Sequence, residues 1–289
     1  MRILSFRKDG YRGLATQNAG GRFFDLTERH ADYPGPLERH LSHGASQRAR
    51  LVDQLLAGEC IHADAVEILP PLAAPGKIIC VGLNYRDHAA ESQMKAPDYP
   101  TLFARFASSL IGGGAPIVRP LDSVKLDYEG ELVAVIGKPG RRIEKSRALD
   151  HVAGYSIFND ASIRDFQLQT PQWTMGKNFD GTGAFGPVFV TADELPAGAR
   201  GLKIETRLNG AVMQRASTDD LIFDVATLVS FISLGITLSP GDIIVTGTPS
   251  GVGAARKPPV FMKAADVCEV EIEGIGVLTN HVADETAFA

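Results

Sequence analysis

The residues best suited to chemistry are three carboxylates that alternate along one short segment. Asp127, Glu129 and Glu131 occur in the run Asp-Tyr-Glu-Gly-Glu, and an apolar stretch, 132–136, follows directly. Side chains alternate with a period of two along a strand, so these carboxylates are expected to share one face. The apolar stretch predicts a strand that is buried on both faces. Carboxylates that enter an apolar interior need a proton, a cationic side chain or a metal ion.

The sequence offers two partners for these carboxylates. One is Lys125, which precedes them on the same face. In that case the segment would be the solvated, acidic end of a strand, and Lys125 would pair with its carboxylates. The other is a metal ion, and ligands that are all oxygen favour Mg²⁺, Mn²⁺ or Ca²⁺ over zinc. A metal held by Glu129 and Glu131 needs a third acidic ligand. Asp160 is a candidate because it follows the strand expected over 154–158.

A second pair of polar residues lies further toward the N-terminus. His88 and Glu91 are three residues apart in a segment that predicts a turn entering a short helix. This spacing places both side chains on one helical face. A carboxylate that orients an imidazole is the arrangement that general-base catalysis requires. The alternative is a pair on a surface helix, which contributes roughly 0.2–0.5 kcal/mol to stability.

Two glycine-rich segments resemble nucleotide-binding motifs without their context. Residues 181–186 match G-x-G-x-x-G, but a strand is expected after them, where a dinucleotide site needs a helix. Residues 247–253 resemble a phosphate loop that lacks the required Lys and Ser/Thr. We interpret the first as a loop. The second is a turn after the strand 243–246, and its amides with Thr248 remain able to hold a small anion.

Composition narrows the class of protein. The chain has 289 residues, of which 44% are hydrophobic and 22% charged, which excludes disorder and collagen-like repeats. The net charge of -5 argues against sequence-independent nucleic-acid binding. Cys60, Cys80 and Cys268 fit no metal or redox spacing and predict buried thiols in a reducing compartment. We see no signal-peptide core and no run near the roughly 18 apolar residues of a membrane span, so we expect a cytoplasmic protein without a membrane partner.

The elements that must position these residues are mostly strands. Strands are predicted over 2–6, 11–16, 22–26, 66–69, 77–81, 132–136, 152–158, 187–191, 203–208, 243–246 and 269–272. Helices are predicted in the C-terminal half of 37–56 and over 87–93, 146–148, 162–168 and 218–234. Strands and helices do not alternate throughout, which argues against a doubly wound parallel sheet and for an α+β, mostly β fold.

A proline-rich stretch divides the chain. Three prolines and two alanines occur within 70–75, which is typical of a linker. We therefore expect a small N-terminal α/β domain over 1–70 and a catalytic domain over 76–289.

Five motifs, taken in this order, resemble the fumarylacetoacetate hydrolase family. They are Asn84-Tyr85…His88…Glu91, Asp127-Tyr128-Glu129-Gly130-Glu131, Asn159-Asp160…Arg164-Asp165…Gln167, Gly176-Lys177 and the segment 241–253. The resemblance covers roughly residues 76–282, and the N-terminal unit is similar to the extra domain of longer bacterial members. It implies layered β-sheets in a β-roll, usually assembled as a homodimer.

The resemblance also implies a metal and a catalytic pair. Mg²⁺ or Mn²⁺ would be held by Glu129, Glu131 and Asp160. His88 and Glu91 would form a catalytic dyad on a short lid helix that orders over bound ligand.

The other implied roles concern the substrate. Lys177, the third catalytic residue, and Gln167 would face the reacting carbonyl. Arg164 would lie behind the ligands or beside the substrate, and Thr248 would hold the substrate carboxylate. Arg105 is a candidate to pair with a second substrate carboxylate, and the alternative for it is a surface arginine. The segment 178–183 is a variable loop to which the resemblance assigns no role.

The implied reaction is hydrolysis of a C–C bond in an acylpyruvate or related 2,4-dioxo acid, a step of aromatic catabolism. The metal would stabilise an enolate, His88 with Glu91 would activate water, and Lys177 would stabilise the oxyanion. The products would be a 2-oxo acid and a carboxylate. The same site would also serve an oxaloacetate decarboxylase, an isomerase or hydratase of unsaturated 2-oxo diacids, or a ureidoglycolate lyase. A non-catalytic 2-oxo acid binding protein is a further class.

Overall fold

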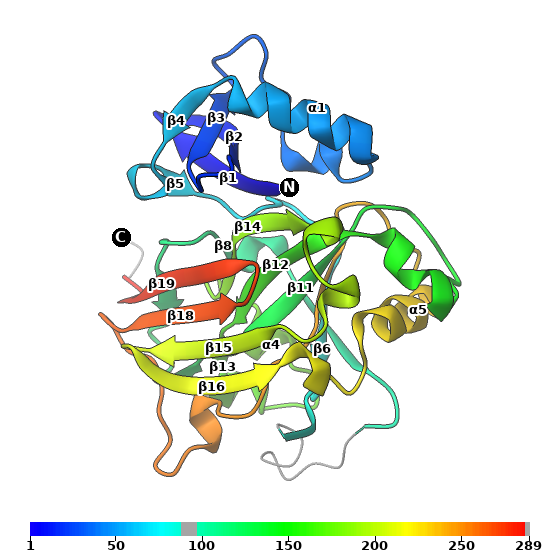
Figure 1. Cartoon of the computed structure of the whole chain (residues 1–289). Coiled ribbons are helices and arrows are strands. Elements are labelled where there is room, and N and C mark those ends of the chain that lie inside the picture. The colour runs from blue at the N-terminus through cyan, green and yellow to red at the C-terminus, as the bar shows by residue number, and fades with distance from the viewer. Residues whose placement is uncertain (88–96, 287–289) are drawn as a thin grey trace.

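The computed structural model describes residues 1–87 and 97–286, and strands dominate it (Figure 1). The strands of the larger sheet are β1 (Arg2–Lys8), β2 (Tyr11–Gln17), β3 (Phe23–Thr27), β4 (Glu59–Ile61), β5 (Glu67–Ile68), β6 (Ile78–Gly82), β7 (Thr101–Arg105), β8 (Leu110–Ile111), β11 (Gly130–Ile136), β12 (Val152–Asp160), β14 (Gly183–Thr191) and β17 (Ile243–Val245). Those of the smaller sheet are β9 (Ile117–Arg119), β15 (Lys203–Leu208), β16 (Ala211–Ser217), β18 (Val267–Ile272) and β19 (Gly276–Asp284). A two-stranded ladder joins β10 (Leu126–Asp127) to β13 (Ser162–Ile163). Besides short 3-10 helices, the described α-helices are α1 (Ala45–Leu56), α3 (Arg164–Gln167), α4 (Thr174–Lys177) and α5 (Val225–Gly235).

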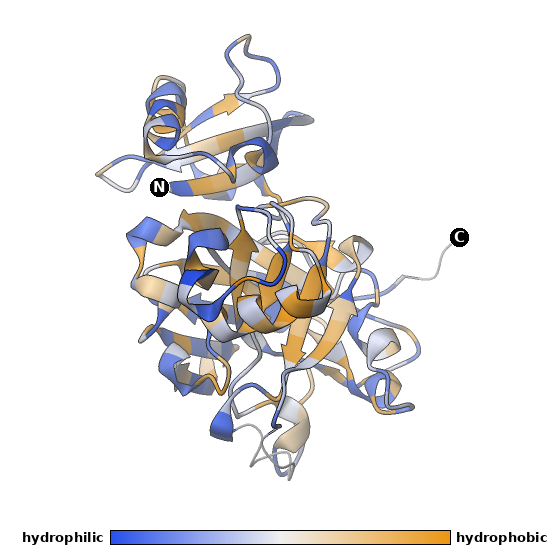
Figure 2. Ribbon diagram, turned by 90° about the vertical axis from the view of Figure 1, so that its right-hand side faces the viewer, coloured by the Kyte–Doolittle hydropathy of each residue, from blue (hydrophilic) through white to orange (hydrophobic). Residues whose placement is uncertain are grey.

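The two sheets form layers. The main path of the larger sheet runs β4-β3-β2-β1-β14-β12-β11-β17-β6-β7, and the smaller sheet runs β16-β15-β18-β19-β9. In Figure 1, the smaller sheet lies in front of β11 and β12. The hydrophobic parts of the ribbon concentrate in the strands of the molecule's interior (Figure 2). The predicted α+β, mostly β fold with layered sheets is therefore confirmed.

The N-terminal unit shares a sheet and a core with the rest of the chain. β1 and β2 form the predicted hairpin, whose turn places Asp9 and Gly10 at positive φ. β1 also pairs with β14, in the register Arg2↔Val190. Ile3 packs in one buried cluster with residues of the larger domain. The boundary at 70–75 stays a prediction, because strand pairing and the core continue across it.

The strand that was expected to carry all three carboxylates is interrupted. β10 ends at Asp127 and β11 begins at Gly130, so Asp127 belongs to a different ladder from Glu131. Beyond the break the predicted burial on both faces is confirmed, since every residue of β11 is buried. Val133 and Val135 pack in one core cluster, whereas their neighbours in the strand pack in the other.

Two helix predictions place the start of the helix wrongly. α5 begins at Val225, not at residue 218, because Asp224 caps it and accepts a hydrogen bond from the Thr227 amide at 2.8 Å. Residues 218–220 form a separate 3-10 helix, and just before α5 the Phe223 amide donates to the Asn84 side chain at 2.8 Å. The helix expected from residue 162 begins at Arg164, because 162 and 163 pair with β10 instead.

The cysteine prediction is confirmed for two residues and wrong for the third. Cys80 and Cys268 are buried, but Cys60 is exposed. Cys60 is the middle residue of the three-residue edge strand β4, and only the last residue of that strand is buried. Among the residues that the structure describes, no helix is long and apolar enough to cross a membrane.

The smaller sheet carries a charged ladder with a defined pH dependence. Glu205 is 5% exposed and contacts Lys203 at 2.9 Å, Arg215 at 2.8 Å and Arg207 at 2.9 Å. The hydrogen bond from Lys203, with those from Arg215 and Arg207, outweighs desolvation and lowers the pKa of Glu205 from 4.5 to about 2. A lowered pKa stabilises the folded chain above pH 4.5, and this contribution is lost as the pH falls toward 2.

We therefore expect Glu205→Gln to lower the free energy of unfolding near neutral pH by about 1–2 kcal/mol, because the exposed partners Lys203 and Arg215 are screened by solvent. Urea unfolding of both proteins across the acidic range measures the effect. The difference should shrink between pH 4.5 and pH 2. A difference that stays constant over this range would contradict the assignment.

Candidate metal centre and active site

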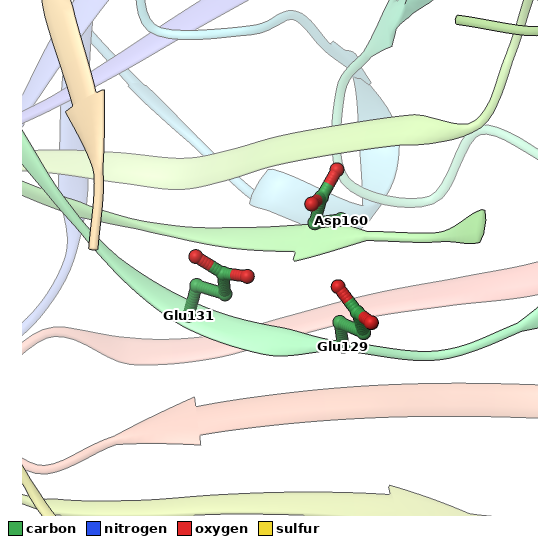
Figure 3. Close-up of side chains that lie close together, drawn as sticks. All are labelled: Glu129, Glu131 and Asp160. Atoms are coloured by element: carbon green, nitrogen blue, oxygen red, sulfur yellow. The ribbon is translucent and has the colours of Figure 1, made fainter. Parts of the chain in front are cut away.

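Glycine between the two glutamates lets the sheets approach each other. A Cβ on Gly130 would lie 2.2 Å from Oγ1 of Thr206 and 2.8 Å from Cγ1 of Val270, both on the smaller sheet. The face of the backbone that Gly130 presents is therefore filled by that sheet. Because side chains alternate, Glu129 and Glu131 point the other way, toward Asp160 (Figure 3).

Asp160 is brought to the glutamates by the pairing of β11 with β12. Gly130 pairs with Asn159, and the Asp160 amide donates to the Glu129 carbonyl at 2.8 Å. Carboxylate oxygens of Glu129, Glu131 and Asp160 all lie within 4.8 Å of one another. The three residues are 6%, 2% and 1% exposed, respectively. The structure thus brings together the three carboxylates that were predicted as metal ligands.

Three cations meet this cluster, each from a different element. Lys177 Nζ lies 2.6 Å from Glu129 Oε2 and 2.6 Å from Asp160 Oδ2. Arg105, at the end of β7, pairs with the other oxygen of Asp160. Arg164, at the start of α3, donates Nη1 to Glu129 Oε1 at 2.7 Å. The carboxylates thus pair with cations that are distant in the sequence, and not with Lys125, the partner considered from sequence.

Glu131 differs from the other two carboxylates. It forms no ion pair within the described residues and accepts a hydrogen bond from the Gly247 amide. Burial raises the pKa of Glu131 well above its usual value, and the charges of Asp160 and Glu129 raise it further. A buried carboxylate of this kind requires a proton or a metal ion.

The balance of charge fits a divalent cation. Asp127 and the three clustered carboxylates are buried beside Arg105, Arg164 and Lys177, so acidic groups exceed basic groups by one. A divalent cation would turn this deficit into a single positive charge, which suits an anionic substrate. Oxygen ligands of this type suit hard divalent cations such as Mg²⁺ and Mn²⁺. The residues present therefore fit the metal that the sequence predicts, with Glu129, Glu131 and Asp160 as its holders.

Lys177 is held as an ammonium group. Burial by itself would lower the pKa of Lys177, but Asp160 and Glu129 outweigh this effect and the pKa is raised. The side chain is 1% exposed, and Nζ lies 5.1 Å from the centre of the Phe103 ring. This distance is that of a cation–π contact.

Asp127 occupies the glycine-rich turn that was expected to remain open to a small anion. Its carboxylate accepts from the amides of Gly253 at 2.7 Å and Ala254 at 2.9 Å. It also accepts from Arg164 Nε at 2.8 Å. Asp127 thereby joins the turn to the arginine that binds Glu129. The alternation of carboxylates in the sequence did not reveal this separate role.

A cavity of about 290 Å³ opens over the carboxylates. Its lining residues are Val81, Gly82, Leu83, Phe103, Glu129, Glu131, Arg164, Gln167, Leu168, Trp173, Lys177, Thr248, Val252, Ala254 and Ala255. Apart from the charged groups at its base, the wall is largely apolar. Trp173 packs against β6 at Gly82, which has no side chain. A Cβ at this position would lie only 2.4 Å from the Trp173 ring.

Of the predicted substrate contacts, Lys177, Gln167, Arg164 and Thr248 line this cavity, and Arg105 does not. Arg105 lies behind Asp160, where Nη2 donates to Thr182 Oγ1 at 2.7 Å. The expected pairing of Arg105 with a second substrate carboxylate therefore has no support in this geometry.

The polar groups of the remaining candidates are largely engaged by the protein. Thr248 Oγ1 donates to the Gly130 carbonyl at 3.0 Å and accepts from Gln214 at 2.7 Å. Gln167 Oε1 accepts from Arg164 at 2.9 Å, whereas Nη2 of Arg164 has no acceptor among the described residues. His88 and Glu91 lie outside the described residues.

The layered sheets and the carboxylate centre together define a protein built around a divalent metal site. The family model described as fumarylacetoacetate (FAA) hydrolase C-terminal matches residues 77–283. The chain belongs to this enzyme family.

Three similar proteins illustrate the range of the family. Oxaloacetate tautomerase FAHD2A, mitochondrial, from Homo sapiens is 39% identical over 98% of this chain and 91% of its own length. The fumarylacetoacetate hydrolase of psychrophilic Exiguobacterium antarcticum superposes with a TM-score of 0.85 at 37% identity, covering 99% of this chain and 100% of its own. Maleylpyruvate hydrolase from Sphingobium sp. SYK-6, in complex with manganese (II) ion and pyruvate, superposes with a TM-score of 0.82 at 27% identity. It covers 99% of this chain and 100% of its own.

Proposed function

We propose that this chain is an enzyme that uses Mg²⁺ or Mn²⁺ to interconvert the enol and keto forms of oxaloacetate or a close 2-oxo acid. The observation that carries the proposal is the place of Lys177. Its ammonium group lies in the cavity wall and contacts two of the three clustered carboxylates at 2.6 Å. A proton donor at this point lies beside any substrate that reaches the metal.

The metal, when bound, supplies a Lewis acid that favours the enolate of a 2-oxo acid. Lys177 moves the proton at C3. Toward the ketone, the enol hydroxyl loses its proton to solvent water, Nζ donates a proton to C3, and the neutral amine regains a proton from solvent. Toward the enol, the same transfers run in the opposite direction. Arg164 lines the cavity and keeps Nη2 without an acceptor in the described chain, so this nitrogen is suited to a substrate carboxylate.

Tautomerisation needs fewer groups than hydrolysis does. Hydrolysis requires, in addition, a base that activates water. The human relative that is described as an oxaloacetate tautomerase is similar over 98% of this chain, which supports the same assignment.

The test uses metal-stripped protein to which Mg²⁺ or Mn²⁺ is restored. Loss of the ultraviolet absorbance of enol-oxaloacetate, release of CO₂ and consumption of acetylpyruvate and fumarylpyruvate are followed in parallel. We expect metal-dependent loss of the enol without CO₂. Release of CO₂ in step with the enol would make the enzyme a decarboxylase. Consumption of an acylpyruvate alone would assign it to the hydrolases.

Hydrolysis of an acylpyruvate is the second candidate. It is favoured by the spacing of His88 and Glu91 and by the similarity to maleylpyruvate hydrolase. This reaction would use the same enolate, with water attacking the distal carbonyl.

His88→Ala separates the two candidates within one protein. We expect the variant to keep its metal affinity and its tautomerisation rate and to lose any hydrolysis, because only water attack needs the imidazole. Isothermal titration with Mn²⁺ and the two assays measure these quantities. Full hydrolytic activity in the variant would refute the role of His88 in water activation.

Assembly and location stay predictions. We propose a homodimer, which light scattering tests, and a cytoplasmic location, although the human relative is described as mitochondrial.

A further inference from the structure

The side chain of Asn178 bonds to the edge strand β7 of the larger sheet. β7 is the last strand on the main path of that sheet, so its outer backbone groups have no neighbouring strand among the residues that the structure describes. Asn178 takes the place of such a strand. Its Nδ2 donates to the Ala104 carbonyl at 3.1 Å, and its Oδ1 accepts from the Phe106 amide at 2.6 Å.

The same side chain also holds the helix that carries Lys177. Nδ2 of Asn178 donates to the Thr174 carbonyl at 2.9 Å, at the first residue of α4. α4 spans only Thr174–Lys177, and a helix this short has no stability of its own. Its opposite side is packed closely, because a Cβ on Gly176 would lie 2.3 Å from the Gln167 amide.

The tie between β7 and α4 joins the two cations that hold Asp160. Arg105, from β7, pairs with Asp160 Oδ1, and Lys177, from α4, pairs with Oδ2. Phe103, also on β7, contacts the Lys177 ammonium. The position of Lys177 Nζ relative to the carboxylate cluster therefore depends on the distance between β7 and α4.

We propose that Asn178 is a positioning residue for Lys177, acting by clamping α4 to the edge of β7. This inference rests on the proposed function, in which Lys177 carries the proton. An asparagine suits the clamp because its amide donates and accepts at once. Aspartate at this position would keep the bond to Phe106 but would face the carbonyls of Ala104 and Thr174 without a donor. The assignment gives a role to the first residue of the loop that follows Lys177.

The test compares Asn178→Ala and Asn178→Asp with Asn18→Ala as the matched control. The side chain of Asn18 also bonds to the backbone, since its Oδ1 accepts from the amides of Gly20 and Arg22, but it lies in a turn of the N-terminal unit. We expect both Asn178 variants to lose about 10–100-fold in kcat, because misplaced catalytic groups and lost positioning bonds have effects of this size. KM and Mn²⁺ affinity should stay within about threefold, and the control should keep full kcat.

Amide hydrogen exchange supplies a readout that does not depend on turnover. Exchange within 174–177 should accelerate in the Asn178 variants and not in the control. Unchanged exchange would overturn the clamp, and so would accelerated exchange with an unchanged kcat. A parallel loss of metal affinity would make Asn178 part of the metal centre instead. If the wild-type protein catalyses none of the assayed reactions, the proposed function fails, and the exchange data alone then decide whether the clamp exists.

Discussion

Glu131→Gln is expected to abolish metal binding and turnover together while leaving the fold intact. Glutamine keeps the shape of the side chain and an oxygen that can accept from the Gly247 amide. It removes the carboxylate that has no ion pair within the described residues and whose pKa burial raises. Since substitutions of groups that only support metal ligands cost about 10–100-fold in affinity, loss of a ligand should cost at least about 100-fold.

Stability should respond in the opposite sense when no metal is present. Glu131 is buried near two other acids, so its neutral replacement relieves desolvation and repulsion in the metal-free protein. We expect the metal-free variant to melt no lower than the wild type. The rise in Tm on adding Mn²⁺, which reports binding to the native state, should disappear.

Calorimetric titration with Mn²⁺ and thermal melts with and without metal test this prediction. Glu67→Gln is a suitable control, because Glu67 pairs with Arg7 on the exposed side of the N-terminal unit. A Glu131→Gln protein that binds Mn²⁺ as tightly as the wild type would show that the metal is held elsewhere.

Lys177→Met is expected to separate turnover from metal binding. Methionine fills the buried site without a charge or a proton. If Lys177 moves the proton, kcat should fall by about 10²–10⁴-fold, the usual contribution of one acid–base group. Mn²⁺ should still bind, because Glu129, Glu131 and Asp160 all remain.

The same substitution should make the protein depend more on metal. Without the ammonium group, Glu129 and Asp160 lose a partner at 2.6 Å and are left buried near each other. Breaking a buried ion pair costs roughly 3–5 kcal/mol, so the metal-free variant should melt well below the wild type. Added Mn²⁺ should recover most of that loss, since the cation neutralises the same carboxylates.

Melting curves with and without Mn²⁺, together with the tautomerisation assay, provide the measurements. Lys8→Met is the control, because it removes an exposed pair with Glu59 in the N-terminal unit. Retained kcat in Lys177→Met would refute the role of Lys177 as the proton carrier. A metal-free Tm equal to that of the wild type would show that the ion pairs contribute little.

Local patterns in the chain were enough to predict the strand β11, and the family resemblance named the three carboxylates as metal ligands. An apolar run that follows alternating acidic residues predicts a strand that is buried on both faces. The acidic residues before it then lie at the edge of the apolar interior. The motifs also named Lys177, Gln167, Arg164 and Thr248, which line the cavity. In contrast, the helix expected from residue 218 starts later, because Asp224 caps it and residues 218–220 form a separate 3-10 helix.

The motifs therefore indicated which groups are available: the acids of the centre, the buried strand that leads to them, and the family. How the charges are shared depended on the packing of the whole chain. This packing separated Asp127 from the metal ligands, placed Arg105 behind Asp160, and set Lys177 between Glu129 and Asp160. The physical reason is that periodicity describes neighbours along one strand. Ion pairs in a buried centre form between elements far apart in the chain, and only sheet order and packing bring those together.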